Sequence, residues 1–219
     1  MDQVLLTTSH IGTDEAGKGD YFGPLVVAAA YADELALTRL PEAGVKDSKR
    51  LSDASLRRKE DAVRQICPAF EVVLISPVRY NELYAKIGNL NRLLAWAHAR
   101  ALETLLSHPA CAGCETALTD KFGDEGYLQR SLMERGRRVQ VVQQVRAESD
   151  PAVAAASVLA RAAFLRSLLG ISARVGIELP RGATHVIPAA RQVYAQGGLD
   201  LLRQVAKLHF KTTKEVAPG

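Results

Sequence analysis

The stretch "GTDEAGKGD" (Gly12–Asp20) combines two patterns that require opposite binding partners. Gly17 and Lys18 complete the G-x-x-x-x-G-K spacing of a loop that binds phosphate. Asp14 and Glu15 place two adjacent carboxylates inside the same loop, and carboxylates are hard oxygen ligands for Mg²⁺ or Mn²⁺. The choice between an anion site and a cation site therefore decides which fold and which function the sequence supports.

The residues that follow this stretch favour the cation site. A phosphate loop needs Ser or Thr after its lysine, but Gly19 stands there, and "DYFGP" replaces the helix that should follow. Two carboxylates would also repel a polyphosphate in a partly dry site. Asp14 and Glu15 instead suit the end of a strand, where glycines permit a turn. The alternative is a solvated Asp-Glu pair in a turn, and the pair alone does not exclude it.

Composition predicts one globular domain spanning residues 1–219. With 219 residues, 47% of them hydrophobic and 24% charged, the chain can bury a core without disulfides. The net charge of +4 is compatible with a nucleic acid partner but does not demand one. The odd count of 3 cysteines and the lack of a secretory signal predict reduced thiols and a cytoplasmic protein. The apolar runs fall short of a membrane span, so no membrane association is expected.

The hydrophobic pattern predicts an α/β domain built round a mixed central β-sheet, with helices concentrated toward the C-terminus. Strands are expected within residues 9–17, 23–32, 69–77, 114–123 and 137–149. Helices are expected at residues 53–66, 78–87, 90–108 and 149–170, and two further helical segments on either side of Gly197 and Gly198. The strand at 137–149 is expected to bury Val139, Val141 and Val145 alternately. A loop is expected at residues 41–51.

Two other predicted strands also end in acids. "ETALTD" ends at Asp120, and "QVVQQVRAES" brings Glu148 just ahead of a helix that Asp150 caps and Gly170 stops. Strand ends can converge at one edge of a sheet, which would gather Asp14, Glu15, Asp120 and Glu148. Each acid also has an ordinary explanation, as a turn former or as a charge favoured by the helix dipole.

Several separated motifs agree, in order, with one family. "IGTDEAGKGDYFGPLVVAAAY", "VKDSKRLSD", "LTDKFG", "AESDPAVAAASVLARAAFL", "LPRGA" and "AKLHFK" are similar to those of the type 2 ribonucleases H. They most resemble the catalytic domain of bacterial ribonuclease HIII. The resemblance runs from about Ile11 to Thr212, nearly the whole chain.

The resemblance implies a ribonuclease H-like fold and an endonuclease that hydrolyses the RNA strand of an RNA–DNA hybrid. By motif position, Asp14, Glu15, Asp120 and Glu148 would hold two divalent ions, Mg²⁺ or Mn²⁺, that carry out the hydrolysis. Glu at the fourth position resembles the HIII branch, since the HII branch usually has Asp. Asp124, four residues past Asp120, and Asp150 are the next candidates among the acids.

The resemblance also gives the glycine stretch a role in reading the substrate. Gly17 and Gly19 would let backbone approach the minor groove, where 2′-hydroxyls distinguish RNA from DNA, and Lys18 would contact phosphate. Ahead of a helix, Lys46, Ser48 and Lys49 suit phosphate binding or a plain polar loop. The basic segment 207–214 is a further candidate for contact with the hybrid or a solvated face.

Two departures from the HII pattern favour hybrids with several ribonucleotides. Lys18 stands where HII enzymes usually have Arg, and no motif after Glu178 matches their junction-reading tyrosine. The alternatives are HII-like incision at single ribonucleotides in duplex DNA and a non-catalytic hybrid-binding module. Typical HIII enzymes carry an N-terminal substrate-binding domain, which is not expected here because thirteen residues precede Asp14. A monomer without an obligate protein partner is expected.

Three other residues carry weaker signals. His209 could aid proton transfer, but a packed or phosphate-facing histidine is the simpler interpretation. Cys111 and Cys114 form a single C-x-x-C pair, which lacks the second half of a zinc site and stands in the wrong order for a redox motif.

Overall fold

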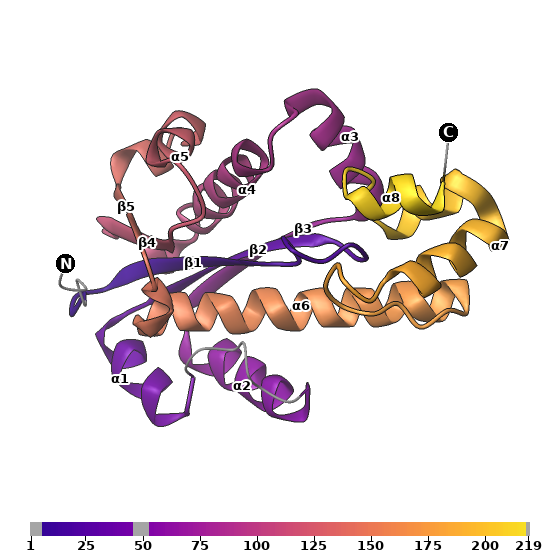
Figure 1. Ribbon diagram of the computed structural model, residues 1–219. Coiled ribbons are helices and arrows are strands. Elements are labelled where there is room, and N and C mark those ends of the chain that lie inside the picture. The colour runs from indigo at the N-terminus through magenta and orange to yellow at the C-terminus, as the bar shows by residue number, and fades with distance from the viewer. Residues whose placement is uncertain (1–5, 46–52, 218–219) are drawn as a thin grey trace. The chain divides into compact units, whose positions relative to one another are not determined.

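The fold is built on one mixed sheet. The computed structural model describes residues 6–45 and 53–217. Its five-stranded sheet has the order β3-β2-β1-β4-β5 (Figure 1). The strands are β1 (His10–Ala16), β2 (Leu25–Ala32), β3 (Ala69–Ile75), β4 (Thr116–Asp120) and β5 (Gln140–Gln144). β4 pairs in parallel with both β1 and β5. The mixed sheet, the flanking helices and the helical C-terminal part confirm the predicted fold class.

The chain divides into two compact units. Within the described residues, the first unit contains 6–15, 27–45, 53–73 and 91–162, and the second contains 16–26, 74–90 and 163–217. Most of the sheet therefore belongs to the first unit. The expectation of a single domain over residues 1–219 stays a prediction.

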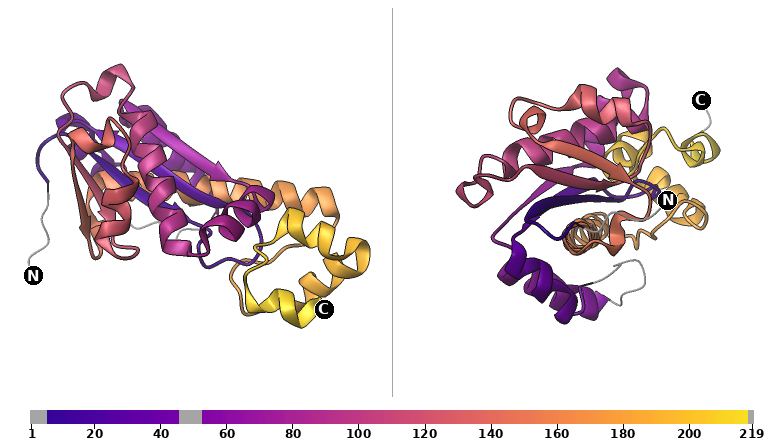
Figure 2. Two further views of the ribbon diagram at one scale, coloured as in Figure 1. Left: turned by 90° about the horizontal axis from the view of Figure 1, so that it is seen from above. Right: turned by 90° about the vertical axis from the view of Figure 1, so that its left-hand side faces the viewer.

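Helices cover both faces of the sheet in the first unit. α4 (Leu90–Leu105) lies on one face, and the opposite face carries α1 (Glu34–Glu42), α2 (Asp53–Ile66) and the first half of α6 (Pro151–Val175) (Figures 1 and 2). α5 (Glu125–Ser131) follows β4. A Cβ on Gly12 would lie 2.1 Å from the carbonyl carbon of Ala152, so glycine is what lets β1 approach α6 this closely. Small residues at this contact thus set the spacing between strand and helix.

The second unit is mainly helical. It contains residues 16–26, α3 (Pro77–Ile87), the second half of α6, α7 (Ile187–Val205) and α8 (Lys211–Val216). Gly197 and Gly198 have non-helical backbone angles inside α7, which confirms the predicted break between two helical segments.

Three single-turn 3₁₀ helices complete the described elements: η2 (Pro109–Cys111), η3 (Gly136–Arg138) and η4 (Ala147–Ser149).

The prediction that Gly170 stops α6 is wrong. The helix continues to Val175 and ends before Gly176, whose φ of +68° is the left-handed conformation that terminates helices. An interior glycine costs a helix only about 1 kcal/mol. Leu168 and Ile171 lie on either side of Gly170 and are buried. Burial of each side chain stabilises the fold by on the order of 2 kcal/mol, which outweighs that cost.

Other expectations about the elements are also wrong. The sequence analysis did not predict α1, α5 and α8. Pro41, expected in a loop, lies inside the last turn of α1. β5 ends at Gln144, and Val145, expected to be buried, is 63% exposed. The hydrophobic alternation therefore continues past the point where the strand turns toward η4.

The long helix α6 is mostly apolar, with Arg161, Arg166 and Arg174 as its charged residues. An 18-residue window within it has a mean hydropathy of 1.6, enough by length and composition to cross a membrane. However, 72% of that window is buried inside the protein, as in a core helix.

Candidate active site

Two of the predicted acids lie near the C-terminal ends of neighbouring parallel strands, Asp14 two residues before the end of β1 and Asp120 at the last residue of β4. In the register of β1 and β4, Thr13 lies opposite Thr119, and each threonine is followed by an acid, Asp14 or Asp120. Parallel strands end at the same edge of a sheet, so both carboxylates emerge side by side. The charge of Asp120 raises the pKa of Asp14, as expected for neighbouring carboxylates. The sheet therefore brings these two predicted residues together.

Asp14 has a strongly perturbed pKa. Burial, together with the charges of Glu15 and Asp120, raises its pKa to about 7, against the opposing effect of hydrogen bonds from Ser157 and from the backbone of Glu15. The Glu15 N–H donates to Asp14 Oδ1 at 2.8 Å. Ser157 belongs to α6, the helix that Gly12 admits close to β1. Repulsion between like charges is thus built into this site.

Glu148 is linked to Asp120 through the backbone. The N–H of Ala147 donates to Asp120 Oδ1 at 3.1 Å, and Glu148 follows directly on η4. Arg146, the residue before this turn, has φ +60°, a left-handed conformation that costs a non-glycine residue roughly 1–3 kcal/mol. This backbone conformation of Arg146 sets the direction in which the chain leaves β5 toward Glu148. We call Asp14, Glu15, Asp120 and Glu148 the acid edge.

A histidine that the sequence analysis did not select lies beside the acid edge. His98, on α4, is fully buried, and its Nε2 is 3.3 Å from Glu15 Oε2. Its Nδ1 is 2.9 Å from Thr13 Oγ1. The signal in the sequence was weak, because a single histidine on the apolar face of a helix is often only a packed residue.

The two alternative acids have capping roles in the structure. Asp124 caps α5 by accepting the N–H of Gly126 at 2.9 Å. Asp150 accepts the N–H groups of Ala152 and Val153 at the start of α6, as predicted for an N-cap. Its carboxylate also lies 3.0 Å from Nε2 of His10, deep in the first unit.

The glycine turn, residues 17–20, belongs to the second unit. Asp20 N–H donates to the Gly17 carbonyl at 3.3 Å, and Gly17 has φ +85°. A Cβ on Gly17 would lie 2.3 Å from the Pro24 carbonyl oxygen, whereas a Cβ on Gly19 would meet nothing within 4 Å. The first glycine is therefore required by the turn itself. The second leaves open space in front of an exposed backbone.

Lys207 anchors the chain that follows this turn. Its side chain is fully buried, and its Nζ donates to the carbonyl oxygens of Asp20 and Gly23, each at 2.8 Å. Burial lowers the pKa of Lys207 to about 7, against the raising effect of Asp20. The lysine was expected in a basic segment facing the substrate or solvent, and that expectation is wrong for Lys207. It is an internal donor.

The remaining candidates are peripheral or undescribed. Lys46, Ser48 and Lys49 lie outside the described residues, so their predicted phosphate contacts stay predictions. His209 packs against Tyr84, with ring centroids 4.3 Å apart. Cys111 and Cys114 are buried free thiols, and burial raises the pKa of Cys111 to about 12.

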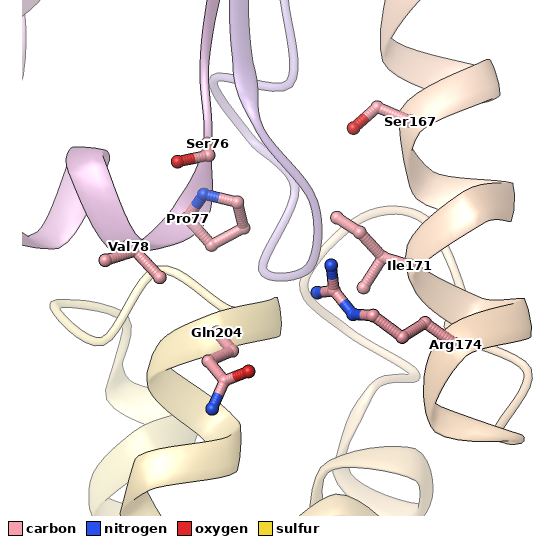
Figure 3. Close-up of a pocket in the computed structure, with 7 residues that line it drawn as sticks. All are labelled: Ser76, Pro77, Val78, Ser167, Ile171, Arg174 and Gln204. Carbon is pink, nitrogen blue, oxygen red and sulfur yellow. The ribbon is translucent and has the colours of Figure 1, made fainter.

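A cavity of about 280 Å³ in the second unit contains none of the predicted acids. It is lined by Ser76, Pro77, Val78, Ser167, Ile171, Arg174 and Gln204 (Figure 3). The Arg174 side chain is its only charged lining residue. It is therefore not part of the acid edge.

The acid edge fits a hard divalent cation by its donor chemistry. Across residues 6–45 and 53–217, no three His, Cys, Asp or Glu side chains form a ready-made metal-holding group. However, the charges of Glu15 and Asp120 raise the pKa of Asp14, and a bound cation relieves that repulsion. Oxygen ligands of this kind suit Mg²⁺ and Mn²⁺ alike.

A mixed sheet with acids near the ends of adjacent parallel strands matches one class of protein, the nucleases with a ribonuclease H-like fold. Comparison with known proteins narrows this class. The family model for ribonuclease HII matches residues 11–213. The chain belongs to the ribonuclease HII family.

Named relatives and solved structures agree with this family. The ribonuclease HIII of Protochlamydia amoebophila is 42% identical over 206 residues, which cover 94% of this chain and 67% of the relative. The crystal structure of Bst-RNase HIII in complex with Mn²⁺ is 35% identical, with a TM-score of 0.88, and the match covers 97% of this chain and 70% of that one. Ribonuclease H2 from Pyrococcus horikoshii is 25% identical, with a TM-score of 0.80 over 95% and 97% of the two chains. The resemblance drawn from the sequence motifs is confirmed.

Proposed function

We propose that the chain hydrolyses the RNA strand of RNA–DNA hybrids at the acid edge, with Asp14, Glu15, Asp120 and Glu148 holding two divalent cations. Family membership makes the chain a ribonuclease H endonuclease that uses divalent metal ions. The observation that supports the residue assignment is that Asp14 and Asp120 directly follow the register pair of Thr13 and Thr119 on β1 and β4. The backbone link from Ala147 to Asp120 adds Glu148 to the same edge.

The four acids would act as ligands and not as proton carriers. When bound, two divalent ions supply an activated water and stabilise the charge that develops on the leaving 3′-oxygen. The chain's own contribution is to hold carboxylates where a cation lowers their mutual repulsion. Ser157 and the Glu15 N–H hold Asp14 in place through hydrogen bonds to its carboxylate. The Ala147 N–H does the same for Asp120.

The glycine turn is the proposed reader of the substrate. The open space at Gly19 would admit the sugar edge of the hybrid to the backbone, where 2′-hydroxyls mark the RNA strand. Lys18 would contact a phosphate. Lysine offers fewer planar donors than the arginine usual in HII enzymes. Together with the missing tyrosine motif, this supports a preference for runs of ribonucleotides, as in HIII enzymes.

The protein's surroundings are also part of the proposal. We place it in the cytoplasm as a monomer that needs no protein partner. The free thiols of Cys67, Cys111 and Cys114 are consistent with a reducing compartment.

Cleavage of two end-labelled substrates tests the activity and its specificity. One is a continuous RNA–DNA hybrid and the other a DNA duplex with one embedded ribonucleotide, each with Mg²⁺, Mn²⁺ or EDTA. Metal-dependent cleavage of the hybrid alone is expected. Efficient cleavage of both would assign HII-like incision instead. Metal-independent cleavage, or none with either substrate, would contradict the proposed chemistry and leave a hybrid-binding role.

A further inference from the structure

His98 joins the two strands that carry the acid edge. Its Nδ1 lies 2.9 Å from Thr13 Oγ1 and 3.5 Å from Thr119 Oγ1. These threonines are a register pair on β1 and β4, each one residue ahead of an acid. A single buried ring on α4 therefore contacts both strands at the residues that directly precede Asp14 and Asp120. α4 lies along this face of the sheet in Figure 1.

The orientation of the imidazole ring is fixed by packing. Phe122 stacks on it with a centroid separation of 4.6 Å and an interplanar angle of 13°. His98 is 0% exposed and Phe122 is 7% exposed, so solvent does not compete for the ring. With Nδ1 held toward the threonines and one ring face covered, Nε2 can point in only one direction. Its ionic neighbour there is Glu15 Oε2 at 3.3 Å.

Strand geometry explains why Glu15 and not Asp14 meets this ring. Successive side chains of a strand point to opposite faces of the sheet. Thr13 and Glu15 therefore share the α4 face, while Asp14 turns toward Ser157 on α6. The Asp-Glu pair is thus supported from two sides, by a hydroxyl on one helix and by an imidazole on the other.

We propose that His98 is a positioning residue for Glu15 at the acid edge, an inference that rests on the proposed function. In the structure Nε2 lies 3.3 Å from Oε2 without the geometry of a hydrogen bond, and it has no other hydrogen-bond partner among the described residues. A carboxylate only accepts hydrogen bonds, so the proposed contact needs the hydrogen on Nε2. Nδ1 then accepts the hydroxyl proton of Thr13. Holding one carboxylate oxygen restricts the rotamers of Glu15 and so fixes the direction from which its carboxylate meets a cation. Hydrogen bonds to metal-ligating carboxylates commonly change metal affinity by about 10–100-fold.

A matched pair of substitutions separates this role from plain packing. The side-chain amide of His98→Gln reaches the position of Nε2, whereas that of His98→Asn reaches only the position of Nδ1. Mn²⁺ affinity is measured by calorimetry on the full chain without substrate, and kcat and KM are measured with the hybrid. His98→Asn is expected to weaken Mn²⁺ binding and lower kcat by about 10–100-fold with little change in KM. His98→Gln is expected to stay within a few-fold of wild type.

Two further variants make the outcome decisive. The exposed His185→Gln serves as the control for histidine replacement, and thermal unfolding checks the fold of each variant. Glu15→Gln supplies the benchmark, because adding His98→Asn to it should cause no further loss of Mn²⁺ affinity. Full additivity of the two losses, or equal behaviour of the Gln and Asn variants, would refute the positioning role. If Glu15→Gln itself left Mn²⁺ binding unchanged, the proposed metal site would fail instead.

Discussion

The acid edge and the glycine turn follow one another along the chain but are held in place by opposite means. In the acid edge, burial and the charges of Glu15 and Asp120 raise the pKa of Asp14 to about 7. The glycine turn is made of backbone, secured by the Lys207 hydrogen bonds and by a position where only glycine fits. At the acid edge, a bound cation would reduce the repulsion between carboxylates, whereas the glycine turn is a preformed backbone surface. Changes at the acid edge should therefore affect rate and metal binding, and changes at the turn should affect stability and substrate affinity.

The largest effect is expected from Asp120→Asn. Loss of this carboxylate should lower kcat on the hybrid by roughly 10³-fold or more, the scale of losing electrostatic stabilisation at a reacting centre. KM and the unfolding temperature should change little, because the substitution removes repulsion and keeps the side-chain volume. Single-turnover cleavage with Mn²⁺ measures the rate.

Asp124→Asn is the matched control for this loss. Asparagine caps a helix about as well as aspartate, so the stability of the variant should lie within about 0.5 kcal/mol of wild type. Its rate should stay near wild type because Asp124 caps α5. A loss at Asp124 comparable to that at Asp120, with an unaffected Glu148→Gln variant, would move the fourth ligand from Glu148 to Asp124.

The glycine turn gives the second contrast, between Gly17→Ala and Gly19→Ala. A Cβ at Gly17 meets the Pro24 carbonyl at 2.3 Å on a backbone with φ +85°, which should lower the free energy of unfolding by roughly 3–4 kcal/mol. A Cβ at Gly19 meets no protein atom, so stability should stay within about 0.5 kcal/mol. KM of Gly19→Ala for the hybrid should rise by about 10-fold if substrate approaches there. Urea unfolding and steady-state cleavage measure both, and an unchanged KM would remove Gly19 from the substrate surface.

Lys207→Met tests what anchors the turn. Methionine fills similar space but leaves the Asp20 and Gly23 carbonyls without their buried donor, which should cost roughly 3 kcal/mol. The folded-state pKa of Lys207 is about 7, below its unfolded value of 10.5. The stability that wild type gains from this group is therefore full above pH 10.5 and lost as pH falls through about 7. The deficit of the variant should be larger at pH 9 than at pH 6. If Lys207→Met and wild type were equally stable at both pH 9 and pH 6, the amine would contribute nothing to the free energy of unfolding.

Sequence patterns predicted the parts of the fold that rest on local chemistry. The strand ending at Asp120, the Asp150 cap and the break at Gly197 follow from residue types at fixed spacings. Gly170 misled the prediction because tertiary burial along α6 outweighs the small helix penalty of glycine. Local patterns cannot report that kind of compensation.

The residues of the candidate site also divide into those that sequence patterns predict and those that they do not. Asp14 and Asp120 were predictable because parallel strands end together. His98 and Lys207 were not, because their roles depend on partners far along the chain, such as Glu15 83 positions before His98 and Gly23 184 positions before Lys207. A buried histidine and a buried lysine look, in sequence, like a core residue and a surface charge. Only the fold assigns them their partners.

The smallest expected effect concerns the stored repulsion itself. In metal-free protein, Asp14 keeps its proton up to about pH 7, whereas its unfolded value is 3.8. The folded state therefore binds more protons between these values, and stability falls as pH rises through them. Asp14→Asn cannot ionise and escapes this loss. At pH 8 in EDTA it should be more stable than wild type by roughly 2 kcal/mol, less than the full pKa difference gives because the side chain keeps some solvent contact.

Urea unfolding of Asp14→Asn and wild type at pH 4 and pH 8 measures this difference. The two proteins should differ by well under about 1 kcal/mol near pH 4, where the carboxyl of the wild type is protonated in the folded state and close to half protonated in the unfolded state. Saturating Mn²⁺ at pH 8 should remove or reverse the advantage of the variant, because the cation stabilises only the form that binds it. A variant less stable than wild type in EDTA at pH 8 would mean that Asp14 stabilises the fold. The acid edge would then be a hydrogen-bonded structural cluster, without the repulsion that distinguishes it from the glycine turn.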